Sequence, residues 1–92
     1  MKLRYSRRAL SQLASVYEYL HERSPSAADN VRASIRSTIA RLKSMPGLGK
    51  LTDEPGVHVI IEPGYRYRVF YMVRDGGLYV IRILHGRQER DR

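Results

Sequence analysis

Arginine is the residue type in this sequence that most clearly indicates a chemical role. The 92 residues include 17 Lys and Arg against 9 Asp and Glu, which gives a formal charge of +8. A guanidinium group binds phosphate or carboxylate through two parallel hydrogen bonds. A positive field of this size favours a nucleic acid, an acidic protein or an anionic membrane surface as the partner. The alternative is that the charge serves only solubility.

Metal and cofactor chemistry is not indicated by the sequence. The chain has no cysteine, and His21, His58 and His85 stand apart without the spacing of a metal-ligand motif. Residues 47–50 contain only part of a phosphate-binding loop motif, and no serine lies in a nucleophile elbow. We therefore expect no bound metal and no cofactor.

One reaction needs neither a metal nor a protein nucleophile, namely the cleavage of RNA by its own 2′-hydroxyl group. The protein must then supply proton transfer and cations for the charge that develops on the phosphate. Arg68, Arg82 and Arg87 could supply the cations, and His85 could transfer a proton because histidine titrates near neutral pH. An equally good interpretation of His85 is structural, as a strand-end side chain that is hydrogen-bonded to the backbone.

The length of the chain fits one domain over residues 1–92, with a polar tail at residues 88–92. The absence of cysteine excludes disulfides, which favours the cytosol. No apolar run is long enough for a signal peptide or a membrane-spanning helix. We expect a cytoplasmic protein without a membrane partner.

Two helices are predicted in the first half of the chain, behind a short strand. Residues 2–5 alternate between basic and apolar types, as in a strand. Ser6 and Ser24 are typical helix-capping residues, and apolar residues recur at spacings of three and four after each of them. This pattern predicts helices over residues 7–23 and 25–44, joined so closely that they form an antiparallel hairpin.

The second half of the chain is rich in β-branched and aromatic residues. A Gly- and Pro-rich connector is expected at residues 46–56, followed by strands over residues 57–61, 65–74 and 78–84. Gly-containing turns separate these strands and make them an antiparallel meander. The predicted fold class is α+β, with a short N-terminal strand, a helix hairpin and a three-stranded meander.

Side-chain alternation divides the last two strands between the two faces of the sheet. We expect the more apolar set to face the helices: Tyr67, Val69, Tyr71, Val73, Tyr79, Ile81 and Ile83. The other face then combines apolar residues with cations: Phe70, Met72, Val80 and Leu84 with Arg66, Arg68 and Arg82. Such a mixture suits a surface that docks a macromolecule. The alternative is that these arginines only form surface ion pairs with carboxylates such as Glu62, Asp75 or Glu89.

Six short motifs follow one another in a fixed order along the chain. They are residues 3–9 (Leu-Arg-Tyr-Ser-Arg-Arg-Ala), Pro25 with Ala28, residues 46–49 (Pro-Gly-Leu-Gly), residues 55–57 (Pro-Gly-Val), residues 67–73 and residues 81–87. Each motif is weak alone, and their order and spacing together are fairly specific. Over nearly the whole chain, this arrangement resembles the RelE/ParE superfamily of bacterial toxins from type II toxin–antitoxin systems, which have a β-α-α-β-β-β fold.

The resemblance implies one of two activities. ParE-like toxins inhibit DNA gyrase and block replication, and the ending His85-Gly86-Arg87 is similar to that branch. RelE-like toxins cleave mRNA on the ribosome; Arg68 matches an arginine of that branch, and His85 falls near the histidine that some of its members use. The tyrosine that such nucleases often carry near the C-terminus is missing, since none follows Tyr79. The resemblance therefore favours a gyrase inhibitor, with an mRNA endonuclease and an inactive interaction domain as alternatives.

The resemblance also implies binding residues and a partner. The target is expected to contact Arg66, Arg68, Arg82, His85 and Arg87, of which Arg68, Arg82 and His85 would be catalytic in a nuclease. A cognate antitoxin, acidic and ParD- or RelB-like, is expected to bind the toxin in a hetero-oligomer and to make the contact with operator DNA. Its surface on the toxin is expected at Phe70, Met72, Val80, Leu84 and Tyr19.

Overall fold

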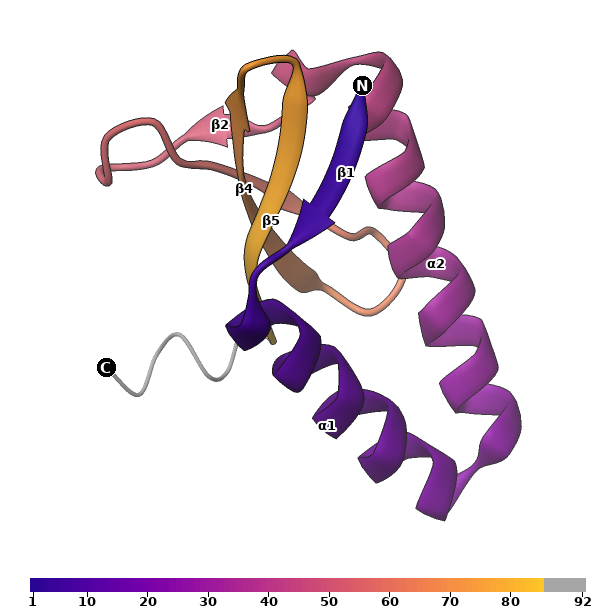
Figure 1. The fold of residues 1–92 in the computed structure, drawn as a ribbon. Coiled ribbons are helices and arrows are strands. Elements are labelled where there is room, and N and C mark those ends of the chain that lie inside the picture. Colours follow the sequence, from indigo (N-terminus) through magenta and orange to yellow (C-terminus); the bar gives the residue numbers. More distant parts are fainter. Residues whose placement is uncertain (86–92) are drawn as a thin grey trace.

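The computed structural model describes residues 1–85, in which two helices pack on one face of a five-stranded sheet (Figure 1). The strand β1 (Lys2–Tyr5) leads into α1 (Arg7–Arg23) and α2 (Pro25–Ser44). A 3₁₀ turn (Pro46–Leu48) is followed by four strands: β2 (Lys50–Leu51), β3 (His58–Ile61), β4 (Tyr67–Arg74) and β5 (Gly77–His85). The predicted α+β class is confirmed.

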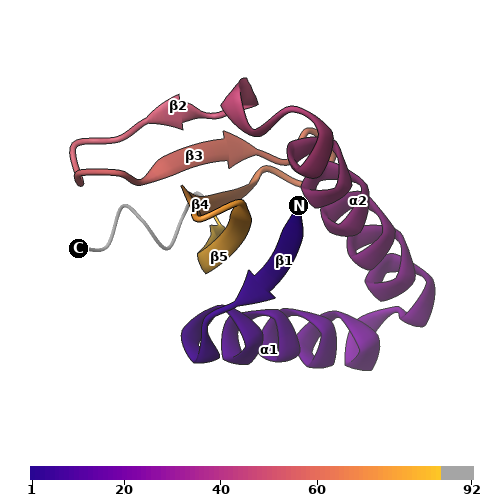
Figure 2. The same ribbon diagram turned by 45° about the horizontal axis from the view of Figure 1, so that its top comes forward.

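The two helices have the predicted bounds, and each begins where a serine hydroxyl caps its N-terminus. Ser6 Oγ accepts a hydrogen bond from the Ala9 N–H at 2.9 Å, and Ser24 Oγ accepts one from the Ala27 N–H at 3.3 Å. Ser24 also ends α1, because its backbone is extended (φ −161°, ψ 105°), while its N–H donates the last helical hydrogen bond to the Leu20 carbonyl oxygen at 2.7 Å. From this single linking residue the helices diverge as an open V, so the expected hairpin is splayed (Figures 1 and 2).

The sheet is mixed, with the strand order β1-β5-β4-β3-β2. The strands β3, β4 and β5 form the predicted antiparallel meander, and β1 pairs in parallel with β5. The strand β2 was not predicted, because residues 46–56 were expected to be a connector only. Its two residues pair with Val59 and His58 and extend the sheet at the edge beside β3 (Figure 2).

The core lies between the helices and the face of the sheet that they cover. The helix α2 supplies most of the helical part with Val31, Ile35, Ile39 and Leu42, whereas the one fully buried residue of α1 is Ala9. Burying each large aliphatic side chain stabilises the fold by roughly 1.5–3 kcal/mol. The helix α2 therefore carries the larger share of the packing energy.

A β-bulge decides which residues of β5 enter this core. Phe70 pairs with Arg82 and Tyr71 pairs with Val80, so Ile81 is an extra residue on β5. The bulge reverses the alternation of faces at that point. As a result Leu78 (0% exposed), Val80 (0%) and Ile83 (1%) all face the helices.

The predicted faces are therefore only partly right. Tyr67, Val69, Tyr71 and Ile83 lie in the core as expected. The expected placement of Tyr79 and Ile81 against the helices is wrong, because the alternation was extrapolated across the bulge. Val80 was expected on the opposite face for the same reason and is buried. Val73 lies near the end of β4 and is 37% exposed.

Tyr71 connects this core to the chain between α2 and β3. Its hydroxyl donates to the Pro46 carbonyl oxygen at 2.7 Å and accepts from the Gly49 N–H at 2.9 Å, and its ring stacks on His58. Gly49 fits there because it has no side chain: a Cβ atom would lie 2.8 Å from the Val59 carbonyl oxygen. The position of the connector, and hence of β2, depends on this contact.

Glu62 organises the turn between β3 and β4 from within the protein. The carboxylate is fully buried and accepts hydrogen bonds from the Ser34 hydroxyl and from the N–H groups of Gly64 and Tyr65. Arg66 is in the left-handed region, with φ 68°, and its N–H donates to the Glu62 carbonyl oxygen at 3.0 Å. The strand β4 therefore begins at Tyr67, two residues later than predicted.

Substitution Tyr71→Phe tests the contribution of the hydroxyl. We expect it to lower the free energy of unfolding by about 1–3 kcal/mol, because the Gly49 N–H and the Pro46 carbonyl both lose a partner in a part-buried site. Urea denaturation of the purified protein measures this change. The control Tyr65→Phe, at a residue that is 39% exposed, should change the value by less than about 0.5 kcal/mol. Equal effects of the two substitutions would contradict the assignment.

Alkaline pH tests the burial of the tyrosines. Burial raises the pKa of Tyr5, Tyr17, Tyr67 and Tyr71 above the ordinary value of 10.0, and nearby Arg36 or Arg32, or the Gly49 N–H, opposes this rise for three of them. The neutral phenols stabilise the fold fully below pH 10.0, and this stabilisation is lost as the pH rises through the higher folded-state pKa values.

We therefore expect the free energy of unfolding to fall only above about pH 10, together with a delayed rise of phenolate absorbance. Denaturant titrations at stepped pH, followed by tyrosine absorbance, measure both quantities. Ionisation of every tyrosine at the ordinary value, without loss of stability, would contradict the prediction.

Candidate functional site

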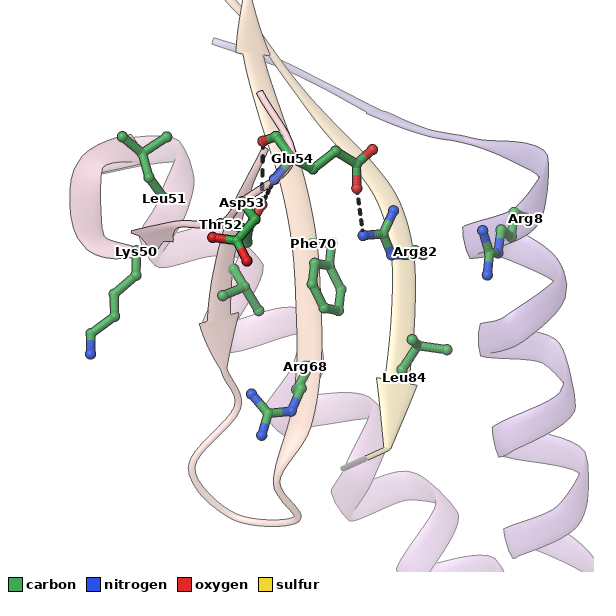
Figure 3. A pocket seen from close by; sticks show the side chains of 11 residues that line it. Arg8, Lys50, Leu51, Thr52, Asp53, Glu54, Arg68, Phe70, Arg82 and Leu84 are labelled. Carbon is green, nitrogen blue, oxygen red and sulfur yellow. Dashed lines mark hydrogen bonds and ion pairs between the residues drawn. The ribbon is translucent and has the colours of Figure 1, made fainter. Parts of the chain in front are cut away.

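A groove of about 630 Å³ lies on the face of the sheet that the helices leave open (Figure 3). Its floor comes from β4 and β5, one wall from the segment around β2, and the other wall from the start of α1. The lining residues are Arg8, Lys50, Leu51, Thr52, Asp53, Glu54, Val59, Arg68, Phe70, Arg82 and Leu84. Four of them are cations and two are carboxylates, so the groove is positively charged overall.

On the floor of the groove, cations and apolar side chains alternate both across the strands and along each strand. Arg68 pairs across the strands with Leu84, and Phe70 pairs with Arg82. Along each strand the two types are separated by one residue, which places them on the same face. Figure 3 shows these four side chains projecting from β4 and β5 on the side away from the helices. The expected combination of arginines with apolar residues on one face is therefore present at these positions.

Arg82 is held in the groove by two contacts. Its Nη2 atom lies 2.8 Å from Glu54 Oε1, and its guanidinium carbon lies 4.3 Å from the centre of the Phe70 ring. The second contact is a cation–π interaction, which orients the guanidinium plane over the aromatic face. The Arg82 side chain is 18% exposed. This is an oriented cation at the groove floor, suited to binding a carboxylate or a phosphate.

The turn between β2 and β3 brings Glu54 over Arg82. The Thr52 N–H donates to the Val57 carbonyl oxygen at 2.8 Å, and the Val57 N–H donates to the Glu54 carbonyl oxygen at 3.1 Å. The Thr52 hydroxyl donates to the same Val57 oxygen and accepts from the Glu54 N–H at 3.1 Å. Gly56 allows the turn, with φ 77°. The backbone at Glu54 is thus fixed, while the Glu54 side chain is 52% exposed.

His85 lies apart from Arg68 and Arg82. It pairs with Tyr67 at the end of the sheet, and the two rings meet edge to face with centroids 5.3 Å apart. Tyr67 belongs to the core on the helix side, whereas Arg68 and Arg82 line the groove on the other side. The structure therefore does not bring together the three residues that a nuclease was expected to use.

The other predicted site residues are spread over the molecule. Arg66 is in the turn before β4 and does not share the groove face, contrary to expectation, because of its positive φ. Val80 is in the core, and Met72 follows Phe70 on the groove side of β4, outside the lining set. Tyr19, which is 55% exposed, lies on α1 under the guanidinium of Arg23. Gly86 and Arg87 lie outside the described residues.

The connector contains groove residues that the sequence analysis missed. Lys50 and Glu54 line the groove, and Leu51 is 70% exposed at its rim. One pattern in the sequence could have indicated a hairpin here: Asp53 and Gly56 lie between two short apolar stretches, which is typical of a hairpin turn. Arg8 was also missed, because its place beside the groove depends on how α1 packs on the sheet.

Neither a metal site nor a membrane span is found in the part of the chain that is described. No three His, Cys, Asp or Glu side chains among residues 1–85 are grouped to hold a metal ion. Within the same residues, neither helix is both long enough and apolar enough to cross a bilayer.

Comparison with known sequences decides the family. The sequence model described as the ParE toxin of the type II toxin–antitoxin system parDE matches residues 3–90. The chain belongs to this family. It is therefore a toxin of the ParE/RelE superfamily, and the resemblance seen in the sequence is confirmed.

Similar proteins come from both branches of the superfamily. Toxin RelE2 of Caulobacter vibrioides is 30% identical over 78 residues, which cover 85% of this chain and 86% of the relative. A solved chain of the chromosomal ParDE system from P. aeruginosa superposes with a TM-score of 0.81 at 20% identity, over 92% of this chain and 95% of that one.

The intact E. coli RelBE toxin–antitoxin complex gives a TM-score of 0.71 at 20% identity, over 92% of this chain and 95% of that one. The isolated E. coli RelE toxin gives 0.70 at 20% identity, over 91% and 82%. These likenesses confirm the RelE/ParE-like fold of the chain.

Proposed function

We propose that this toxin inhibits DNA gyrase by binding it through the groove, and that a cognate acidic antitoxin neutralises it. The observation that carries the proposal is that His85 pairs with Tyr67 of the core face, whereas Arg68 and Arg82 line the groove on the opposite face of the sheet. General acid–base catalysis needs the proton-transfer group within hydrogen-bond reach of the reacting atoms. A phosphate bound by both arginines leaves His85 on the far face, and the groove then acts as a binding surface.

The composition of the groove supports a protein as the target. Arg82 is oriented by the buried Phe70 ring, and Arg68 lies beside the partly buried Leu84, so cations adjoin apolar contact area at Leu84 and at the exposed Leu51. Aromatic and arginine side chains of this kind dominate the binding energy of protein interfaces. The family match to a ParE toxin also supports gyrase as the target.

The antitoxin is proposed to cover the same groove. Leu84 pairs with Arg68 and lies two residues from Arg82 on the groove face, so a protein that buries Leu84 must also cover both cations. Target and antitoxin would then exclude one another sterically. The structural likeness to the ParDE system and to the RelBE toxin–antitoxin complex supports such a hetero-oligomer. Contact with operator DNA is assigned to the antitoxin.

An mRNA endonuclease is the second candidate. It is favoured by the 30% identity with Toxin RelE2 and by the two arginines on one face, which could bind adjacent phosphates. An inactive interaction domain on the same scaffold is a third candidate, and an unchanged growth rate on induction without antitoxin would favour it.

Supercoiling by purified gyrase tests the first proposal. We expect the toxin to inhibit the reaction, and the double substitution Arg68→Gln with Arg82→Gln to raise the half-inhibitory concentration at least about tenfold, because interface arginines are frequent hot spots. The matched control Arg41→Gln with Lys43→Gln removes two exposed cations at the end of α2, outside the groove, and should change inhibition less than about twofold. Full supercoiling at saturating toxin would refute the proposal.

Substitution His85→Ala separates the two activities. A gyrase inhibitor that binds through the groove should keep its inhibitory concentration within about threefold, since His85 packs on Tyr67 on the other face. Induced cells carrying either form should then show inhibited replication and intact mRNA. The endonuclease hypothesis predicts instead that mRNA is cut on the ribosome after induction, and that His85→Ala abolishes the cuts.

A further inference from the structure

Glu54 places a carboxylate of the chain itself at the oriented cation of the groove. Its Oε1 atom lies 2.8 Å from Arg82 Nη2 (Figure 3). Both carboxylates that line the groove, Asp53 and Glu54, come from the turn between β2 and β3, whereas Arg68 and Arg82 come from the floor. The free toxin therefore already fills part of the site to which an acidic partner would bind.

The contact between Glu54 and Arg82 is suited to exchange. The Glu54 side chain is 52% exposed, and an ion pair of this exposure contributes little to stability. The backbone at Glu54 is fixed by Thr52 and Val57, so the side chain can leave without unfolding the turn. Arg82 keeps its contact with the Phe70 ring, and therefore its orientation, after Glu54 leaves.

The pattern of the groove floor also specifies the shape of a partner segment. Side chains two residues apart in an extended segment share one face and are separated by about 6.5–7 Å, the same repeat as on β4 and β5. Arg68 and Phe70 on β4, like Arg82 and Leu84 on β5, follow this repeat as cation and apolar group. The complement is a segment in which acidic and apolar residues alternate at every second position.

We propose that the groove binds an extended acidic segment of the neutralising antitoxin, and that a carboxylate of that segment replaces Glu54 at Arg82. The proposal rests on the proposed function in one respect, namely that a neutralising antitoxin covers the groove. Glu54 then acts as an internal competitor, which lowers the affinity for acidic partners and disfavours segments that carry no carboxylate at the matching position.

A peptide titration with the purified full-length toxin tests the exchange. The probe is a short fluorescent peptide in which glutamate and leucine alternate, separated by single serines, and its affinity is measured by anisotropy. We expect Glu54→Gln to tighten binding about two- to fivefold, because a surface ion pair of modest strength no longer competes. Arg82→Gln should weaken binding about tenfold, and adding Glu54→Gln to it should restore nothing.

Asp53→Asn is the matched control, because it removes the same charge from the same groove without touching the pair with Arg82. It should tighten binding less than Glu54→Gln does. Equal gains for the two variants would show a general charge effect and overturn the exchange. Unchanged or weaker binding by Glu54→Gln would overturn it too, by showing that Glu54 only positions Arg82. A probe with lysine in place of glutamate should not bind.

The gyrase assay distinguishes a failure of this inference from a failure of the proposed function. The peptide titration contains no gyrase, so its outcome is independent of the target. Inhibition of gyrase with no gain in peptide affinity for Glu54→Gln would leave the proposed function standing and remove the exchange. A gain in peptide affinity for Glu54→Gln without any inhibition of gyrase would leave the exchange standing and refute gyrase as the target.

Discussion

The single extra residue in β5 is the constraint on which the core and the groove both depend. Without the bulge at Ile81, Leu78, Val80, Arg82 and Leu84 would share one face of the strand. Either Arg82 would be buried against the helices, which is costly for an unpaired charge, or Leu78 and Val80 would be lost from the core. With the bulge, Leu78, Val80 and Ile83 are buried and Arg82 points into the groove.

Two buried polar side chains hold the loops around this sheet. The Tyr71 hydroxyl bonds to Pro46 and Gly49 and thereby fixes the start of β2, which forms a wall of the groove. The Glu62 carboxylate accepts from Ser34 on α2 and from the turn before β4. A domain of this size buries a small core, so such satisfied polar contacts replace packing that it cannot supply. These hydrogen bonds, made from the core side of the sheet, therefore fix the position of the segment that forms one wall of the groove.

Local signals in the sequence sufficed for the helices and for the meander of β3, β4 and β5, but not for the pairing of β1 or for β2. Ser6 and Ser24 are local caps, and their effect on the helix ends needs no tertiary information. The bulge at Ile81 has no such signal, because its cause is the packing of both halves of β5 on the helices. The prediction of which residues face the helices was therefore wrong beside the bulge, at Val80 and Tyr79.

In the candidate site, too, placements that depend on local alternation were predictable, and those that depend on distant contacts were not. Arg68, Phe70 and Leu84 were placed together by alternation along the strands, which is a local property. Arg66 was misplaced because the strand was extrapolated through a turn in which Arg66 has a left-handed backbone and its N–H donates to the Glu62 carbonyl oxygen. Glu54 could not be assigned to the groove from sequence, since its proximity to Arg82 spans 28 residues.

The position of Glu54 gives the basic charge of this toxin a specific consequence. A net charge of +8 attracts any polyanion, and long-range attraction by itself selects weakly among partners. An internal carboxylate at Arg82 must be displaced by every ligand of that cation, so a partner that places its own carboxylate there regains the lost ion pair, whereas a partner without one does not. Selectivity in a small basic toxin can thus arise from one acidic residue on a fixed turn. Until the partner binds, the ion pair with Glu54 partly neutralises Arg82, while the Phe70 ring keeps it oriented.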